Sequence, residues 1–138
     1  MARVLVVDDV ERDLSALVSL LEREGHHAVG CSGGQAALER IESDAAGFDA
    51  VIVDIFMPEV DGLETIKALR RRCYDGTILA ISNGGSLARL DVLKIARLLG
   101  ADGSARKPLG ESSFTALNEL LAARGTPSEP RRSAGSSC

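Results

Sequence analysis

Short runs of apolar, β-branched residues alternate along the chain with stretches in which apolar residues recur every three to four positions. Residues 3–7 (RVLVV) and 49–54 (DAVIVD) are almost continuous apolar runs, the pattern of strands buried on both faces. Between them, Leu14, Leu17 and Leu21 recur at helical spacing, which predicts an amphipathic helix over 11–24. The remaining expected strands are 27–31, 77–82 and 103–106, and the remaining expected helices are 34–44, 62–72, 86–99 and 112–123.

Five strand–helix units in strict alternation predict an α/β fold, because parallel strands need crossover helices. Five strands are too few for an eight-stranded barrel. The pattern therefore predicts a doubly wound (βα)5 sandwich with a five-stranded parallel sheet in the flavodoxin-like order 2-1-3-4-5. Such sheets bind ligands outside the carboxyl ends of the strands, where the strand order reverses, here between the first and third strands.

The chain of 138 residues has room for one domain. We expect that domain to cover residues 1–124 and to be followed by a disordered C-terminal tail over 125–138. The tail, GTPSEPRRSAGSSC, contains no aliphatic residue larger than Ala134, so it cannot build a core of its own.

Composition argues against several classes of function. The net charge is −4, and the aromatic residues are only Phe48, Phe56, Tyr74 and Phe114, so a nucleic-acid interface is not expected. No apolar run approaches the roughly 18 residues of a transmembrane helix, so no membrane partner is expected. The first residues do not resemble a signal peptide, and the three cysteines form no CxxC pair. The expected compartment is the cytoplasm.

Polar residues that can carry chemistry stand at the carboxyl ends of the expected strands. Asp8 and Asp9 follow the first strand, Asp54 ends the third, Ser82 ends the fourth and Lys107 follows the fifth. Three carboxylates in one cleft repel one another unless a cation lies between them, and Mg²⁺ prefers such oxygen ligands. Carboxylates, a metal ion, a lysine and a hydroxyl together are typical of phosphoryl transfer onto a carboxylate.

Each of these residues alone has an ordinary structural explanation. An aspartate after a strand is most often a turn or helix-capping residue, and a Lys-Pro pair is a common turn. The functional interpretation rests on their joint occurrence, since four separate strand ends carry the required residue types.

The motifs VLVVDD, VIVDIFMPEVDG, ILAIS and GADGSARKP closely resemble the receiver domain of two-component response regulators, over residues 3 to about 123. The resemblance implies that Asp54 is the phosphoacceptor. It also implies that Asp9, Asp54 and the backbone carbonyl of Phe56 bind Mg²⁺, with Asp8 helping through a water. Lys107 would pair with the phosphoryl group, and the Ser82 hydroxyl would bond to it after transfer.

These roles imply a stand-alone, phosphorylatable signalling module rather than an enzyme acting on a separate substrate. Its phosphoryl donor would be a sensor histidine kinase or a histidine phosphotransfer protein, and its output would be contact with an unknown downstream protein. Beyond phosphotransfer to itself, it would catalyse only slow autodephosphorylation. The expected helix 86–99 carries more apolar residues than one face can bury, so a homodimer through that face is possible.

Two alternatives remain at this stage. A haloacid dehalogenase-type aspartyl-phosphate hydrolase also uses a strand-end aspartate, Mg²⁺ and lysine, but typically carries DxDx[TV] where this chain has DIFMP. A degenerate receiver acting only as a binding platform is the other. One departure from the receiver pattern is Ser104, three residues before Lys107, where the family usually has an aromatic residue that moves on activation. A signal would then travel through the 83–86 loop instead.

Overall fold

The structure, a computed structural model, describes residues 2–44, 47–55, 62–83, 94–107, 115 and 117–122. Phe56, the first part of the expected 86–99 helix and the expected disordered tail over 125–138 lie outside these ranges. The expectations made for them stay predictions.

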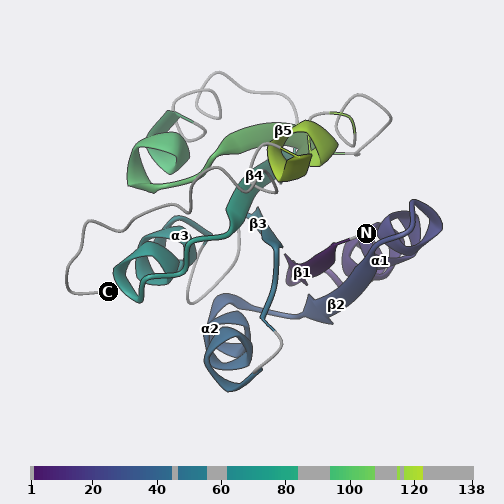
Figure 1. The fold of residues 1–138 in the computed structure, drawn as a ribbon, viewed down its shortest axis with the longest axis horizontal. Coiled ribbons are helices and arrows are strands. Elements are labelled where there is room, and N and C mark those ends of the chain that lie inside the picture. The colour runs from purple at the N-terminus through teal and green to yellow at the C-terminus, as the bar shows by residue number, and fades with distance from the viewer. Residues whose placement is uncertain are drawn as a thin grey trace.

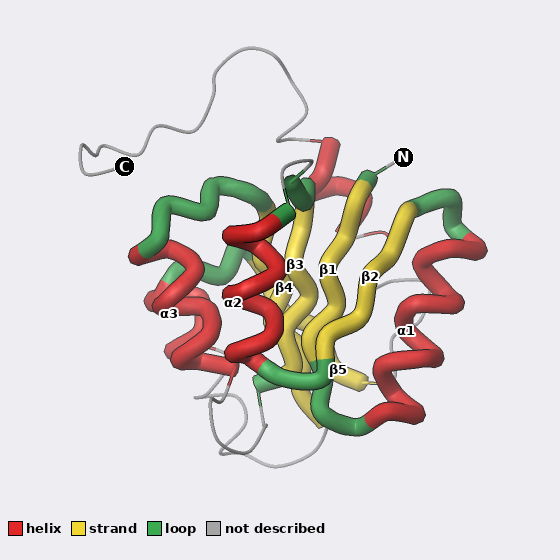
Figure 2. Tube along the Cα trace, turned by 90° about the horizontal axis from the view of Figure 1, so that it is seen from below, coloured by secondary structure: helices red, strands yellow, loops and turns green. Residues whose placement is uncertain are grey.

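Five parallel strands form one sheet in the order β2-β1-β3-β4-β5, which confirms the expected doubly wound topology. In Figure 2 the strands lie side by side between the helices. The three central strands are rich in apolar, β-branched residues, which suits the centre of a sheet that is covered on both faces. The strands are β1 (Arg3–Val7), β2 (His27–Cys31), β3 (Ala50–Asp54), β4 (Thr77–Asn83) and β5 (Gly103–Lys107).

Helices cover both faces of this sheet (Figure 1). They are α1 (Glu11–Arg23), α2 (Gly34–Ser43) and α3 (Gly62–Arg71), with further helical residues at 94–99 and 117–122. α2, α3 and residues 94–99 lie on one face, whereas α1 and residues 117–122 lie on the other. Within the described ranges, no helix has the length and apolar character needed to cross a membrane.

Alternation along each strand divides the core between the two faces. In β1, Leu5 and Val7 pack toward α2 and α3, while Val4 and Val6 pack toward α1. All four side chains are fully buried. Burying one such side chain contributes about 1.5–3 kcal/mol, so the two-sided core accounts for the continuous apolar runs in the sequence.

The predicted end of the first helix at Gly25 is confirmed. Gly25 has a φ of +95°, and its N–H donates to the carbonyl of Glu22 at 3.0 Å. The His26 N–H donates to the carbonyl of Leu21, also at 3.0 Å. This pair of bonds is the Schellman motif, which satisfies carbonyls left free at a helix end and favours glycine because of its positive φ.

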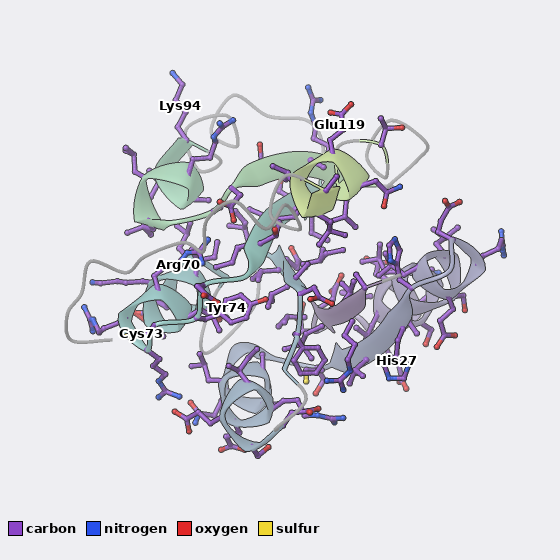
Figure 3. All side chains as sticks on the ribbon, viewed as in Figure 1. His27, Arg70, Cys73, Tyr74, Lys94 and Glu119 are labelled. Carbon is purple, nitrogen blue, oxygen red and sulfur yellow. The ribbon has the colours of Figure 1, made fainter. Side chains whose placement is uncertain are left out.

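Arg70 holds together three segments at the amino edge of the sheet. Its guanidinium donates to the carbonyls of Gly100, Tyr74 and Gly76 at 3.0, 2.8 and 2.9 Å, and pairs with Asp102 at 2.9 Å. In Figure 3, Arg70 and Tyr74 lie between α3 and the sheet. Arg70 thus does far more than favour the dipole at the end of α3, because it joins α3 to the segments that lead into β4 and β5.

Arg3 plays a similar part at the start of β1. Its guanidinium pairs with Asp44 at 3.0 Å, donates to the carbonyl of Gly47 and lies 4.6 Å from the centre of the Phe48 ring. The backbone N–H of Arg3 donates to a carboxylate oxygen of Asp49 at 2.8 Å. The hydrogen bond to Asp44 raises the pKa of Arg3 above its ordinary value. The chain entering β3 is therefore tied to the start of β1.

Candidate functional site

Asp8 and Asp9 stand where β1 ends and the chain turns toward α1. The Asp8 N–H donates to the carbonyl of Cys31 at 3.1 Å, which extends the pairing of β1 with β2 by one residue. One carboxylate oxygen of Asp8 accepts the N–H of Val10 at 2.9 Å. Asp8 is fully buried and Asp9 is exposed. The turn-capping role and the functional role expected for Asp8 are thus compatible, because only one of its two oxygens serves the turn.

Asp54 is the last residue of β3 and is only 2% exposed. It lies opposite Ile81 of β4, and the N–H of Ile55 donates to the Ile81 carbonyl at 2.9 Å. The backbone on both sides of the Asp54 carboxylate is therefore part of the sheet. A carboxylate held in this way has little freedom to move except about its own side-chain bonds.

The three carboxylates converge, as the sequence predicts. β1 and β3 are neighbours with Val7 opposite Val53, so Asp8 and Asp54 follow at the same level of adjacent strands. Carboxylate oxygens of Asp8, Asp9 and Asp54 all lie within 4.8 Å of one another. Mg²⁺ binds oxygen ligands at about 2.0–2.1 Å, so any two ligands lie within roughly 4.2 Å. Small side-chain rotations bring this oxygen-only set to that spacing, and the residues fit the cation.

Ser82 lies in β4, one residue beyond the Ile81 that faces Asp54. The side chain is fully buried, and within the described part of the chain its hydroxyl has no hydrogen-bond partner. A buried hydroxyl without a partner costs about 1–3 kcal/mol. Such a group at the carboxyl edge of the sheet is suited to a polar ligand that arrives later.

Only the backbone of Lys107 belongs to the described structure, and Phe56 lies outside it. Lys107 is the last residue of β5 and its backbone lies opposite Asn83, so it stands at the same edge as Ser82. Its side chain lies outside the described structure, as does the whole of Phe56. The expected contact of the lysine with the phosphoryl group and the carbonyl ligand from Phe56 stay predictions.

Ser104 occupies the middle of β5, opposite Ala80 of β4. Because side chains alternate along a strand, Ser104, Ala80 and Ser82 share one face of the sheet. Ser104 is half-buried there, with Ala96 of the 94–99 helix in the core of the same face. The place where the family usually has an aromatic ring is thus lined by small side chains.

Sequence similarity identifies the family. A model of the response regulator receiver domain family matches residues 4–118. The transcriptional regulatory protein CpxR of Escherichia coli K12 is 30% identical over 132 residues, which cover 96% of this chain and 54% of CpxR. The chain spans about half the length of the curated relatives it matches.

Solved structures agree with this assignment. A response regulator receiver domain protein of Clostridium thermocellum has a TM-score of 0.81 at 24% identity, over 90% of this chain and 97% of that one, and shows the same fold. The response regulator TrrA of Thermotoga maritima is 29% identical, with a TM-score of 0.74 over 87% of this chain and 99% of its own. With the acidic cluster at the strand ends, these similarities show that the chain belongs to the receiver domain family of two-component response regulators.

Proposed function

We propose that this receiver domain accepts a phosphoryl group on Asp54 from a phosphohistidine of a sensor histidine kinase or a histidine phosphotransfer protein. The observation that carries the proposal is the convergence of Asp8, Asp9 and Asp54 within 4.8 Å at the carboxyl edge of the sheet. Ser82, with its buried hydroxyl, lies in the adjacent strand of the same edge. Receiver domains are phosphoacceptor modules, so the site and the family support the same chemistry.

Transfer requires little covalent activation by the protein. A carboxylate oxygen of Asp54 forms a bond to phosphorus while the bond from phosphorus to the donor histidine nitrogen breaks. The electron pair stays on the imidazole, which takes up a proton. Such transfers depend on in-line positioning and on neutralising the charge of the phosphoryl oxygens. The burial of Asp54 at a strand end supplies the positioning.

We assign the neutralisation of the phosphoryl group's negative charge to a cation and a lysine. Asp8, Asp9 and Asp54, with the Phe56 carbonyl, would hold Mg²⁺, which supplies positive charge against the phosphoryl oxygens when bound. The structure of TrrA was determined with Mg²⁺ and a beryllium fluoride group, and TrrA belongs to this family. Lys107, which ends β5 at the same edge, would provide the second positive charge.

Ser82 is proposed to respond to phosphorylation by forming a new hydrogen bond. Once the phosphoryl group is on Asp54, the Ser82 hydroxyl would donate to one of its oxygens, a charge-assisted bond stronger than a neutral one. With Ser104 in β5 no aromatic ring is available there, so the change would pass through residues 83–86. Output would be contact with a downstream protein. A homodimer would use the face expected from the sequence for residues 86–99, where Ile95 and Leu98 offer apolar surface that is 44% and 86% exposed.

The hydrolase alternative has no support. The family match over residues 4–118 and the solved relatives are receiver domains. Breakdown of the aspartyl phosphate is proposed to be slow and to consume only the chain's own phosphoryl group, so we do not class the chain as an enzyme.

The test is labelling by a small phosphodonor such as acetyl phosphate with Mg²⁺, followed by intact mass. We expect one added phosphoryl group on the wild type and none on Asp54→Asn. Asp75→Asn, which changes an exposed loop carboxylate, is the matched control and should be labelled like the wild type. Equal labelling of Asp54→Asn would reject Asp54 as the acceptor, and no labelling of the wild type would favour a binding platform.

A further inference from the structure

Gly62, the first residue of α3, lies directly against the backbone of Asp54. A Cβ atom added at Gly62 would stand 2.3 Å from the carbonyl oxygen of Asp54, 2.5 Å from the Cα of Ile55 and 2.9 Å from the carbonyl carbon of Asp54. The N–H of Gly62 also donates to the Ile55 carbonyl at 3.0 Å. The start of α3 is therefore in contact with the end of β3 through backbone alone.

The atoms that a side chain at Gly62 would meet cannot move aside cheaply. All three are backbone atoms, and that backbone is held in the sheet by the pairing of Asp54 with Ile81 and by the bond from the Ile55 N–H. A methyl group would have to displace either α3 or the end of β3 by several tenths of an ångström. Asp8 and Asp9 follow β1, a different strand, and would not move with such a shift.

Another helix start at the same edge shows no such contact. Gly33 precedes α2 and is its N-terminal capping residue, with an extended φ of −175°. A Cβ added at Gly33 meets no atom within 4 Å. The close approach is thus found at Gly62 and not at Gly33, although both lie at the start of a helix at the same edge.

We propose that Gly62 is a positioning residue for the phosphoacceptor: its missing side chain lets α3 set the Asp54 carboxylate at the distance from Asp8 and Asp9 that transfer requires. This inference rests on the proposed function. Reactions of this type are sensitive to placement, since a misplacement of about 1 Å can lower a rate by roughly a hundredfold. Gly62 touches no reacting atom and acts only through the backbone of Asp54.

The experiment compares Gly62→Ala with Gly33→Ala. Labelling by acetyl phosphate is followed by intact mass over a range of Mg²⁺ concentrations, and urea unfolding gives the folded fraction of each variant. We expect the maximal labelling rate of folded Gly62→Ala to fall by roughly ten- to a hundredfold. Gly33→Ala should stay within about twofold of the wild type, because its methyl group enters open space.

A stability-matched variant separates positioning from folding. Leu21 is fully buried in α1 on the other face of the sheet, and Leu21→Ala should lower the urea midpoint of unfolding because it leaves a cavity in the core. All variants are also assayed in sucrose, which favours the folded state. Leu21→Ala should then regain the wild-type rate, whereas Gly62→Ala should stay slow.

The outcomes are distinct. A normal rate for folded Gly62→Ala, beside a labelled wild type, would overturn the positioning role and leave the proposed function standing. Recovery of Gly62→Ala in sucrose to the same extent as Leu21→Ala would also overturn it. A wild type that is never labelled would reject the proposed function together with this inference.

Discussion

The two edges of the sheet differ in how charged side chains are arranged: opposite charges are paired at the amino edge, whereas like charges lie together at the carboxyl edge. At the amino edge, Arg3 pairs with a carboxylate and donates to one carbonyl, and Arg70 pairs with a carboxylate and donates to three carbonyls, so positive charge is matched by negative partners. At the carboxyl edge, Asp8, Asp9 and Asp54 bring like charges within 4.8 Å. The first arrangement stabilises the folded chain, whereas the repulsion between like charges in the second opposes folding.

The difference indicates that the amino ends of the strands serve stability, whereas their carboxyl ends carry the candidate site. The contacts at the amino edge tie the segments that lead into β3, β4 and β5 to neighbouring elements. The carboxyl edge keeps groups that are unfavourable by themselves, including the buried hydroxyl of Ser82. Local departures from stabilising rules are common at functional sites, because the ligand supplies the missing partner.

The largest effect on the free energy of unfolding should come from removing the Arg70 contacts at the amino edge. Arg70→Ala removes an ion pair whose side chains are less than one-fifth exposed, together with hydrogen bonds to three carbonyls. We expect the free energy of unfolding to fall by about 2–4 kcal/mol, because Asp102 is left without its cation. Urea unfolding measures the loss.

The neighbouring Arg71, exposed on the same helix, supplies the control: Arg71→Ala should change stability by less than about 0.5 kcal/mol. The labelling rate of the folded fraction should be unaffected in both variants. Equal stability of the two variants would show that the network around Arg70 is not a structural clamp.

A smaller effect of opposite sign is expected at the carboxyl edge. Asp9→Ala removes one of three mutually repelling carboxylates and should stabilise the metal-free protein by about 0.5–1 kcal/mol. Mg²⁺ should raise the melting temperature of the wild type, since it binds the folded state, and should raise that of Asp9→Ala much less. Thermal unfolding with and without Mg²⁺ measures both.

Glu11, exposed in the first turn of α1, is the matched carboxylate outside the cluster. Glu11→Ala should instead lose about 0.3–1 kcal/mol, because an acidic residue favours the positive end of a helix. A loss of stability in metal-free Asp9→Ala as well would mean that repulsion within the cluster is negligible.

The smallest effect concerns Cys31, which ends β2 beside Asp8. Burial raises the pKa of the Cys31 thiol, with the charge of Arg40 acting weakly in the other direction. An unfolded chain releases this proton near pH 8.5, whereas the folded chain holds it to higher pH. The folded state therefore binds more protons above that pH, and the stability due to Cys31 falls as the pH rises.

Urea unfolding of the wild type and of Cys31→Ala between pH 7 and 10 checks this sign. The difference in stability between the two proteins should shrink as the pH rises through about 8.5. A difference that stays constant or grows would show that the thiol is not held in its neutral form.

Local patterns in the amino-acid sequence were enough to predict the elements of this fold and the residues of the acidic cluster. The ends of the strands and of the first three helices were predicted to within one residue, because buried strands and amphipathic helices leave local, periodic patterns. The signal that ends a helix is also local, because the glycine at position 25 takes the positive φ that follows α1. Once the strand order was inferred, the meeting of Asp8, Asp9 and Asp54 followed, since neighbouring parallel strands end at one edge.

The contacts that join distant segments could be seen only in the folded structure. Arg70 lies in the last turn of α3, yet its partners Gly100 and Asp102 lie 30 and 32 residues further along the chain. The lack of space at Gly62 depends on how closely α3 packs against β3, and it depends on the packing of the strands that the Ser82 hydroxyl meets no partner among the described residues. Periodicity records which side of an element faces the core, but it carries no distance between elements, so these features exist only in the packed molecule.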